Sequence, residues 1–252
     1  MDPMQSQAED AIAPGLTQWQ RVANTFIAPS ATFEDIKRGN RSWWLPLILL
    51  AIVSYALFAA VSQRIGLQQA VDNQIRMNSN AEAQLAQLTP EQRAMREKIA
   101  ADVIEGVFLA NPVLTIVTIA LLSLGLLGTI NFGFGGRASY GSVLAVWFYA
   151  WLPGAIKTLL GIIVIYAGLA PESFNIKNFA PTNVGAFLDP TAVNKALYAL
   201  ASSVDVVTVW TLVLLGMGVA TVAGVKRRFG YLAVFGWWTI FVLFSVAWAA
   251  FT

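Results

Sequence analysis

The chain alternates long apolar runs with shorter polar segments, and the length of the runs is the most informative pattern. Five runs of about 20 residues each lie at roughly 43–62, 113–131, 143–165, 204–223 and 231–251. An α-helix needs about 20 apolar residues to cross the hydrocarbon core of a bilayer. The sequence therefore predicts an all-α, polytopic membrane protein, a bundle of five transmembrane helices over residues 43–252.

Two short amphipathic helices are predicted in the segment 1–42 that precedes the first span. Thr17 and Gln20 form a capping box, and apolar residues then recur at steps of three and four. Pro29 is expected to end the first helix, and Ser30 to cap a second one. We expect these helices to form a collar around the first span, which includes Phe26, Pro29, Phe33 and Ile36. The collar lies either in the headgroup plane or packed on the bundle's own inner face.

The connection 63–112 is too long for a simple loop and is rich in helix-forming residues. Thr89 as N-cap, Pro90 at the first helical position and Gln92 at the third are typical of a helix start. We predict two long helices joined near Leu88–Thr89, which extend the first and second spans as an outer helical hairpin. This hairpin either docks another protein or folds onto the chain's own outer loops.

Basic residues near the spans are concentrated on one side of the predicted bundle. Within six residues of a span, one side carries seven, whereas the other has Arg64 alone. The seven are Lys37, Arg38, Arg41, Arg137, Lys226, Arg227 and Arg228. By the positive-inside rule, the N-terminus and the connections 132–142 and 224–230 are cytoplasmic. The connections 63–112 and 166–203 and the C-terminus are expected to lie outside.

One charged side chain lies inside a predicted span. Lys157 is in the third span, beyond a kink expected at Pro153–Gly154, and Asp205 lies at the outer mouth of the fourth. An intramembrane charge is costly and suggests function by default. The two residues form a candidate ion pair, and a structural pair or a lysine that snorkels is weighed against a substrate or ion site.

Small residues recur at steps of four in the fourth span, at Gly216, Ala220 and Gly224. A second series, Gly125, Thr129 and Gly133, ends the second span. Such faces let helices approach closely, which favours packing within the bundle and leaves homo-oligomerisation as an alternative.

Composition narrows the chemistry further. The chain has no Cys and no His, which removes thiolate nucleophiles and the commonest metal ligands. No phosphate-binding loop and no hydrolase or zinc-protease motif is present. We therefore expect no catalytic residues, no cofactor and no metal. Because the net charge is only +2 and the basic residues lie beside apolar runs, nucleic acid is not an expected partner.

Several segments resemble the Yip family of five-span membrane proteins, in its bacterial branch. These are the Pro29, Phe33 and Ile36 pattern, "WWLPL" at 43–47, "FYAWLPG" at 148–154 and "VDVVTVWTLVLLGMG" at 204–218. The family is named for eukaryotic members that bind Ypt/Rab GTPases. The resemblance implies the five-span fold and a bacterial inner membrane, and the GTPase binding is not carried over.

The expected function is that of a non-enzymatic scaffold or an accessory subunit of a membrane complex, such as a transport system. Its expected partners are the lipid bilayer, another membrane protein and a second copy of the chain. The alternative is a small transporter or channel that uses Lys157. A transporter needs a polar pathway across the bilayer, and one lysine gives little support for such a pathway.

The predicted orientation can be tested with single cysteines, because the chain has none of its own. Ser79→Cys and Asn183→Cys are expected to react with a membrane-impermeant maleimide in intact cells. Ser139→Cys is expected to react only after permeabilisation. Labelling of Ser139→Cys in intact cells would overturn the orientation.

Overall fold

The computed structural model describes residues 15–251, apart from the side chain of Ser79. Five stretches are long and apolar enough to cross a membrane, namely Trp44–Ile65, Pro90–Gly133, Tyr140–Tyr166, Val206–Ala223 and Arg227–Phe251. Within the described residues the elements are helices, without a strand. The prediction of an all-α fold with five spans is confirmed.

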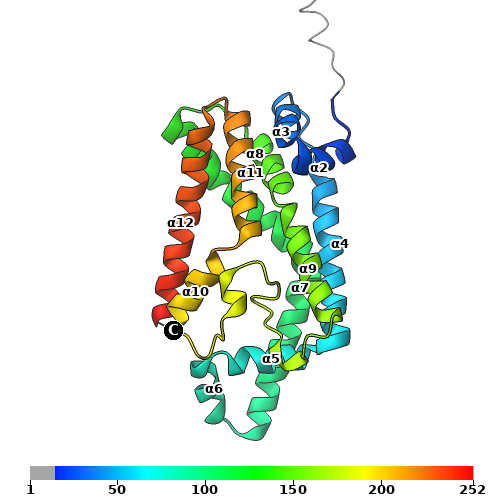
Figure 1. Cartoon of the computed structure of the whole chain (residues 1–252), viewed down its shortest axis with the longest axis vertical. Coiled ribbons are helices and arrows are strands. Elements are labelled where there is room, and N and C mark those ends of the chain that lie inside the picture. The colour runs from blue at the N-terminus through cyan, green and yellow to red at the C-terminus, as the bar shows by residue number, and fades with distance from the viewer. Residues whose placement is uncertain (1–14, 252) are drawn as a thin grey trace, which may run out of the picture.

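The bundle has two distinct ends (Figure 1). At one, which we call the N-terminal end, lie α2 (Gln18–Ile27) and α3 (Pro29–Lys37). At the other, the hairpin end, lie α5 (Leu67–Arg76) and α6 (Ser79–Ala86). The helix α10 (Lys195–Ser203) also lies toward the hairpin end and packs on α12 (Arg227–Phe251). The described chain therefore begins and ends at opposite ends of the bundle.

The start of α3 differs from the prediction. Thr17 and Gln20 do form a capping box at the start of α2. Ala28 is the N-cap of α3, however, and Pro29 occupies its first turn, so Ser30 is not the cap. Proline is suited to this position because the first N–H groups of a helix have no intrahelical partner. Pro29 thus begins the second helix as well as ending the first.

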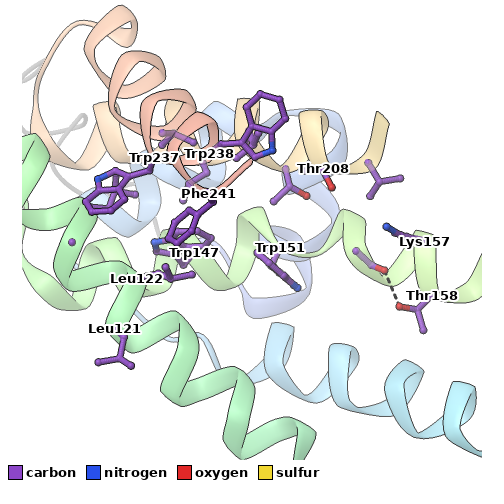
Figure 2. A pocket seen from close by; sticks show the side chains of 18 of the residues that line it. Leu121, Leu122, Trp147, Trp151, Lys157, Thr158, Thr208, Trp237, Trp238 and Phe241 are labelled. Carbon is purple, nitrogen blue, oxygen red and sulfur yellow. Dashed lines mark hydrogen bonds between the residues drawn. The ribbon is translucent and has the colours of Figure 1, made fainter. Parts of the chain in front are cut away.

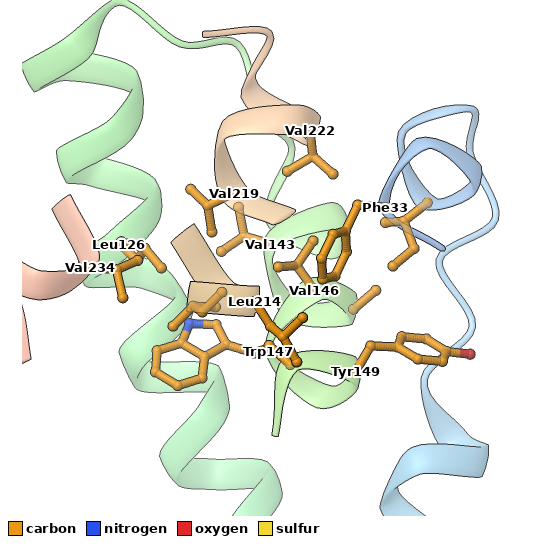
Figure 3. Packing of buried hydrophobic residues seen from close by; sticks show 14 of the residues in the cluster. Phe33, Leu126, Val143, Val146, Trp147, Tyr149, Leu214, Val219, Val222 and Val234 are labelled. Atoms are coloured by element: carbon orange, nitrogen blue, oxygen red, sulfur yellow. The ribbon is translucent and has the colours of Figure 1, made fainter. Parts of the chain in front are cut away.

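Phe33 and Ile36 lie in the protein core, so an interfacial role is wrong for these two residues. Both are completely buried among side chains of α8 (Tyr140–Ala150) and α11 (Val206–Ala223), as Figure 3 shows for Phe33. Gly218 makes room for Phe33, since a Cβ at Gly218 would lie 2.5 Å from Cγ1 of Val146 and 2.9 Å from the Phe33 ring. The helix α3 is therefore part of the bundle.

The other two collar residues are only partly buried. Pro29 lies in the first turn of α3, and the ring of Phe26 makes an edge contact with Trp210 at 5.8 Å between centroids. The side chains of α2 that do face outward include Trp19 and Ile27, both largely exposed.

A buried polar cluster attaches α2 and α3 to the bundle. Arg21 and Asp35 are both buried, with Nε of Arg21 3.6 Å from Oδ2 of Asp35. Nη1 of Arg21 donates to the Asn40 carbonyl at 2.7 Å, and its guanidinium lies over the ring of Tyr149 in α8. The Tyr149 hydroxyl in turn donates to the carbonyl of Ser42. A buried charge is tolerated only when it is paired and hydrogen-bonded, and this cluster meets both conditions.

The outer hairpin has the predicted second arm but not the predicted first one. Thr89 forms a capping box with Gln92, and α7 (Pro90–Gly128) runs from there through the second span. The first arm is broken, because Gly66 has a φ of 87° and Asn78 starts a new helix. It folds onto the outer connection, where Nδ2 of Asn73 donates to the carbonyls of Pro171 and Phe174.

The third span is divided at the predicted proline. α8 ends at Ala150, and α9 (Pro153–Tyr166) begins three residues later, with Pro153 at its start. Proline has no N–H to donate and cannot continue a helix interior without disruption. The Trp151–Leu152 turn lets α9 follow a path separate from α8, and α9 packs on α4 (Trp44–Ala60) and α11.

The burial of Phe33 generates a stability prediction. Phe33→Ala is expected to lower the free energy of unfolding by about 3–5 kcal/mol, because it removes a fully buried ring and leaves a cavity. Thermal unfolding in detergent, followed by intrinsic tryptophan fluorescence, measures the loss. Ile27→Ala, at an exposed site on α2, serves as the control with little expected effect. Equal losses in the two variants would contradict the core position of Phe33.

Candidate functional site

The structure brings Lys157 and Asp205 together, on two different spans. Lys157 lies one turn into α9, just past the break at Pro153, and Asp205 is the N-cap of α11. Nζ of Lys157 lies 2.9 Å from Oδ2 of Asp205. The Asp205 side chain is 2% exposed and that of Lys157 26% exposed. The carboxylate is thus inside the protein, and the ammonium group reaches it from a more open position.

Asp205 has further donors besides Lys157. Its Oδ1 accepts from the backbone N–H of Thr208 at 2.9 Å, which caps α11. Its Oδ2 accepts from the Thr182 hydroxyl at 2.6 Å and from the Asn183 amide at 3.4 Å. These bonds satisfy a buried carboxylate from three sides. Such a carboxylate is stable in a poorly solvated place only because it is both paired and hydrogen-bonded.

Thr182 and Asn183 are the residues of this site that the sequence did not indicate. They lie in the connection between α9 and α11, in a stretch with no helical or strand periodicity. The N–H of Val206 donates to the Thr182 carbonyl at 3.0 Å, and Asn183 and Asp205 form an isolated antiparallel bridge. Asn183 is buried, so the exposed Thr191 of the same connection is the better position for an accessibility label.

A cavity of about 620 Å³ opens next to the pair. Figure 2 shows side chains from α7, α8, α9, α11 and α12 around it, with Lys157 and Thr158 toward one end and Trp237 and Leu121 toward the other. Its walls are apolar for the most part, and four tryptophans contribute to them: Trp147, Trp151, Trp237 and Trp238. Its volume falls in the range of ligand sites, which is about 300–1,000 Å³.

A second cavity, of about 300 Å³, lies on the side of α4. The two cavities share four lining residues, Trp151, Gly154, Thr158 and Phe179. Phe179, from the connection that also carries Thr182, packs directly on Gly161 of α9, where a Cβ would collide with its ring. The same connection therefore donates hydrogen bonds to Asp205 of the ion pair and forms part of the walls of both cavities.

The predicted small-residue face is used at two of its three positions. A Cβ on Gly216 would lie 2.5 Å from Cδ1 of Tyr231, and one on Gly230 would collide with the Gly216 carbonyl and approach Ala220. These contacts hold α11 against α12. Gly224 has another role: it is the C-cap of α11 in the left-handed conformation, with φ 69°, and nothing lies near a Cβ built there.

The second small-residue series is next to α12. The Trp237 indole N–H donates to the Thr129 hydroxyl at 3.0 Å, and the indole ring lies 3.6 Å from a Cβ built on Gly125. A Cβ on Gly133 would meet nothing within 4 Å. Gly125, near the end of α7, and Thr129, the residue that follows α7, thus contact α12 through one tryptophan.

Among residues 15–251, no group of three or more acidic side chains is placed to hold a metal ion. Comparison with known families gives one finding: residues 23–249 match the model of the Yip1 domain. The match covers the first four spans in full, the fifth span except for its last two residues, and the second half of α2. Comparisons with curated proteins and with solved structures gave no match.

The Lys157–Asp205 pair predicts coupling between the two residues. Lys157→Met leaves Asp205 without its cation, and Asp205→Asn leaves Lys157 without its anion while it keeps an N-cap. Each is expected to cost about 2–3 kcal/mol, less than for a fully buried pair because Lys157 is partly exposed. The double variant is expected to lose clearly less than the sum, since neither charge is then alone.

Thermal unfolding of the four proteins completes this double-mutant cycle. Lys177→Met, which removes an exposed lysine outside the spans, is the matched control and should leave the melting temperature almost unchanged. Strictly additive losses at the two positions would show that the pair contributes no coupling energy.

Proposed function

The chain belongs to the Yip1 domain family and is a multi-pass membrane protein, and from this premise we propose that it works without catalysis, as a scaffold or an accessory subunit of a membrane complex. The observation that carries the proposal is the state of its intramembrane charge. Lys157 is paired with Asp205, and the cavity beside it is walled mainly by apolar side chains. Such a site favours holding hydrophobic groups over moving hydrated ones.

A transporter or channel is the alternative, and the described spans give it little support. Apart from Lys157, the stretches 44–63, 113–133, 140–166, 206–223 and 231–251 contain no Lys, Arg, Asp or Glu. Ion pathways and proton relays in membranes are marked by several such residues facing one another. One lysine neutralised by one carboxylate forms no continuous polar path.

The partner that we propose is another membrane protein, and α12 offers the surface for it. In its most apolar stretch only 11% of the residues are buried, the smallest share of the five spans. Its outward face carries large apolar side chains, among them Ile240, Leu243 and Phe244. A second copy of the chain is a further candidate for this surface, and the lipid bilayer surrounds the remaining spans.

We place the N-terminal end of the bundle in the cytoplasm and the hairpin end outside a bacterial inner membrane. Connections that carry basic residues contact one another at the N-terminal end, which supports this orientation. The N–H of Arg137 donates to the carbonyl of Ala223, three residues before Lys226, and the Arg41 side chain lies against Gly141. The positive-inside rule favours the cytoplasm for such a cluster.

Site-directed photo-cross-linking in growing cells tests the scaffold proposal. A photoreactive residue at Leu243 of α12 is expected to give one discrete product with a different membrane protein, identified by mass spectrometry. The same residue at Ile52, an exposed position on α4, is the matched control and is expected to give lipid adducts only. Only lipid adducts at Leu243 would contradict the proposed surface.

Ion flux separates the scaffold from the alternative. Proteoliposomes of the purified chain are expected to conduct no more than protein-free vesicles, at any applied potential. A conductance that Lys157→Met abolishes while the protein stays folded would overturn the proposed function in favour of a channel.

A further inference from the structure

The large cavity opens sideways, between α7 and α12. Leu121 of α7 and Phe241 of α12 both line the cavity. On the outer surface of the spans, Leu121 is 63% exposed and Phe241 is 50% exposed. Trp237 joins the two helices near Thr129, and beyond that contact the cavity separates them. Because both residues lie within membrane-spanning stretches, the medium at this opening is lipid hydrocarbon.

Apart from the indole N–H groups of its tryptophans, the polar side chains of the cavity come from α9 and α11, the helices that carry or begin at the ion pair. They are Lys157 and Thr158 of α9 and Thr208 and Thr211 of α11. The Thr158 hydroxyl already donates to the Gly154 carbonyl. The ammonium group of Lys157 has three N–H bonds, and among the described residues Asp205 is its hydrogen-bond acceptor. Two N–H bonds are therefore available to a ligand, while the charge itself is already balanced.

We propose that this cavity binds one acyl chain of a bilayer lipid, and that Lys157 donates a hydrogen bond to the neutral ester carbonyl oxygen at the head of that chain. The tryptophans and leucines surround the chain along its length. The site is distinct from the protein-binding face proposed for α12, since it lies between helices rather than on one of them.

Other occupants fit the cavity less well. A helix has a diameter of at least about 10 Å with its side chains, so 620 Å³ would admit only about one and a half turns of it. Water would find several polar partners only at the end near Lys157, so it does not stably fill the apolar length of the cavity. A free anion would find a cation whose charge Asp205 already neutralises. A flexible hydrocarbon chain with an oxygen at one end meets all of these conditions.

A photoreactive lipid tests the site directly. The protein is reconstituted into phosphatidylcholine vesicles that contain phosphatidylcholine with a diazirine on one acyl chain, irradiated, and mapped by peptide mass spectrometry. Adducts are expected at Leu122 and Trp238 inside the cavity, in addition to those at the lipid-facing Ile163. Native mass spectrometry after delipidation is expected to retain one phosphatidylcholine per chain.

Filling the cavity is expected to remove these signals. Leu122→Trp adds bulk from α7, and Thr211→Phe adds bulk to the same space from α11, so that one variant remains if the other fails to fold. Each is expected to lower the cavity adducts about tenfold while the adducts at Ile163 stay unchanged. Ile163→Trp, on an exposed face of α9, adds the same bulk outside the cavity and is the matched control.

A separate variant tests the hydrogen bond that Lys157 donates to the lipid. Lys157→Met combined with Asp205→Asn removes both charges together, and is expected to lower lipid retention about tenfold, the factor that one hydrogen bond to a charged donor gives. Unchanged retention would overturn the role of Lys157. Cavity adducts that persist in both filling variants, or a cross-link from a photoreactive residue at Leu122 to a second copy of the chain, would overturn the site.

Discussion

The arrangement of spans and connection toward the hairpin end depends on the hydrogen bonds that the carboxylate of Asp205 accepts. It accepts hydrogen bonds from Lys157 on α9, from Thr182 and Asn183 in the connection that follows, and from the first turn of α11. A single buried charge therefore determines where two spans and a long connection meet. Because a buried carboxylate is costly without these partners, the connection has one favoured place to pack. The polar end of the cavity is at this meeting point.

At the N-terminal end, close packing against α11 has the corresponding role. Because glycine has no side chain, Gly216 lets α12 approach α11 closely, and Gly218 lets α3 approach α11 from another side. Water plays no part in the association of helices inside a bilayer, so close van der Waals contact has to provide much of the attraction. This explains why α11 is the most buried span and why α3, although it crosses no membrane, is built into the same core.

The features that could be predicted from the sequence are those with a periodic pattern of apolar residues or a residue that interrupts such a pattern. The five apolar runs, the capping boxes at Thr17 and Thr89 and the break at Pro153 have local causes, and the structure has them in place. The face of Phe33 and Ile36 was ambiguous, because a helix on the headgroups and a helix packed on protein have the same apolar periodicity. Asn73 and Thr182 could not be found at all, since their partners lie about a hundred and about twenty residues away.

The two interpretations of Lys157, a structural ion pair and a ligand site, are compatible in this geometry. Asp205 accepts one of the three ammonium N–H bonds, and Lys157 also lines the cavity, so the other two can donate to a group bound there. Pairing also removes the net charge that would make an empty cavity in hydrocarbon expensive. An unpaired lysine would require an anion to be present at all times, whereas a paired one permits a neutral oxygen to come and go. The ion pair that stabilises the fold is thus also what makes a reversible lipid site physically possible there.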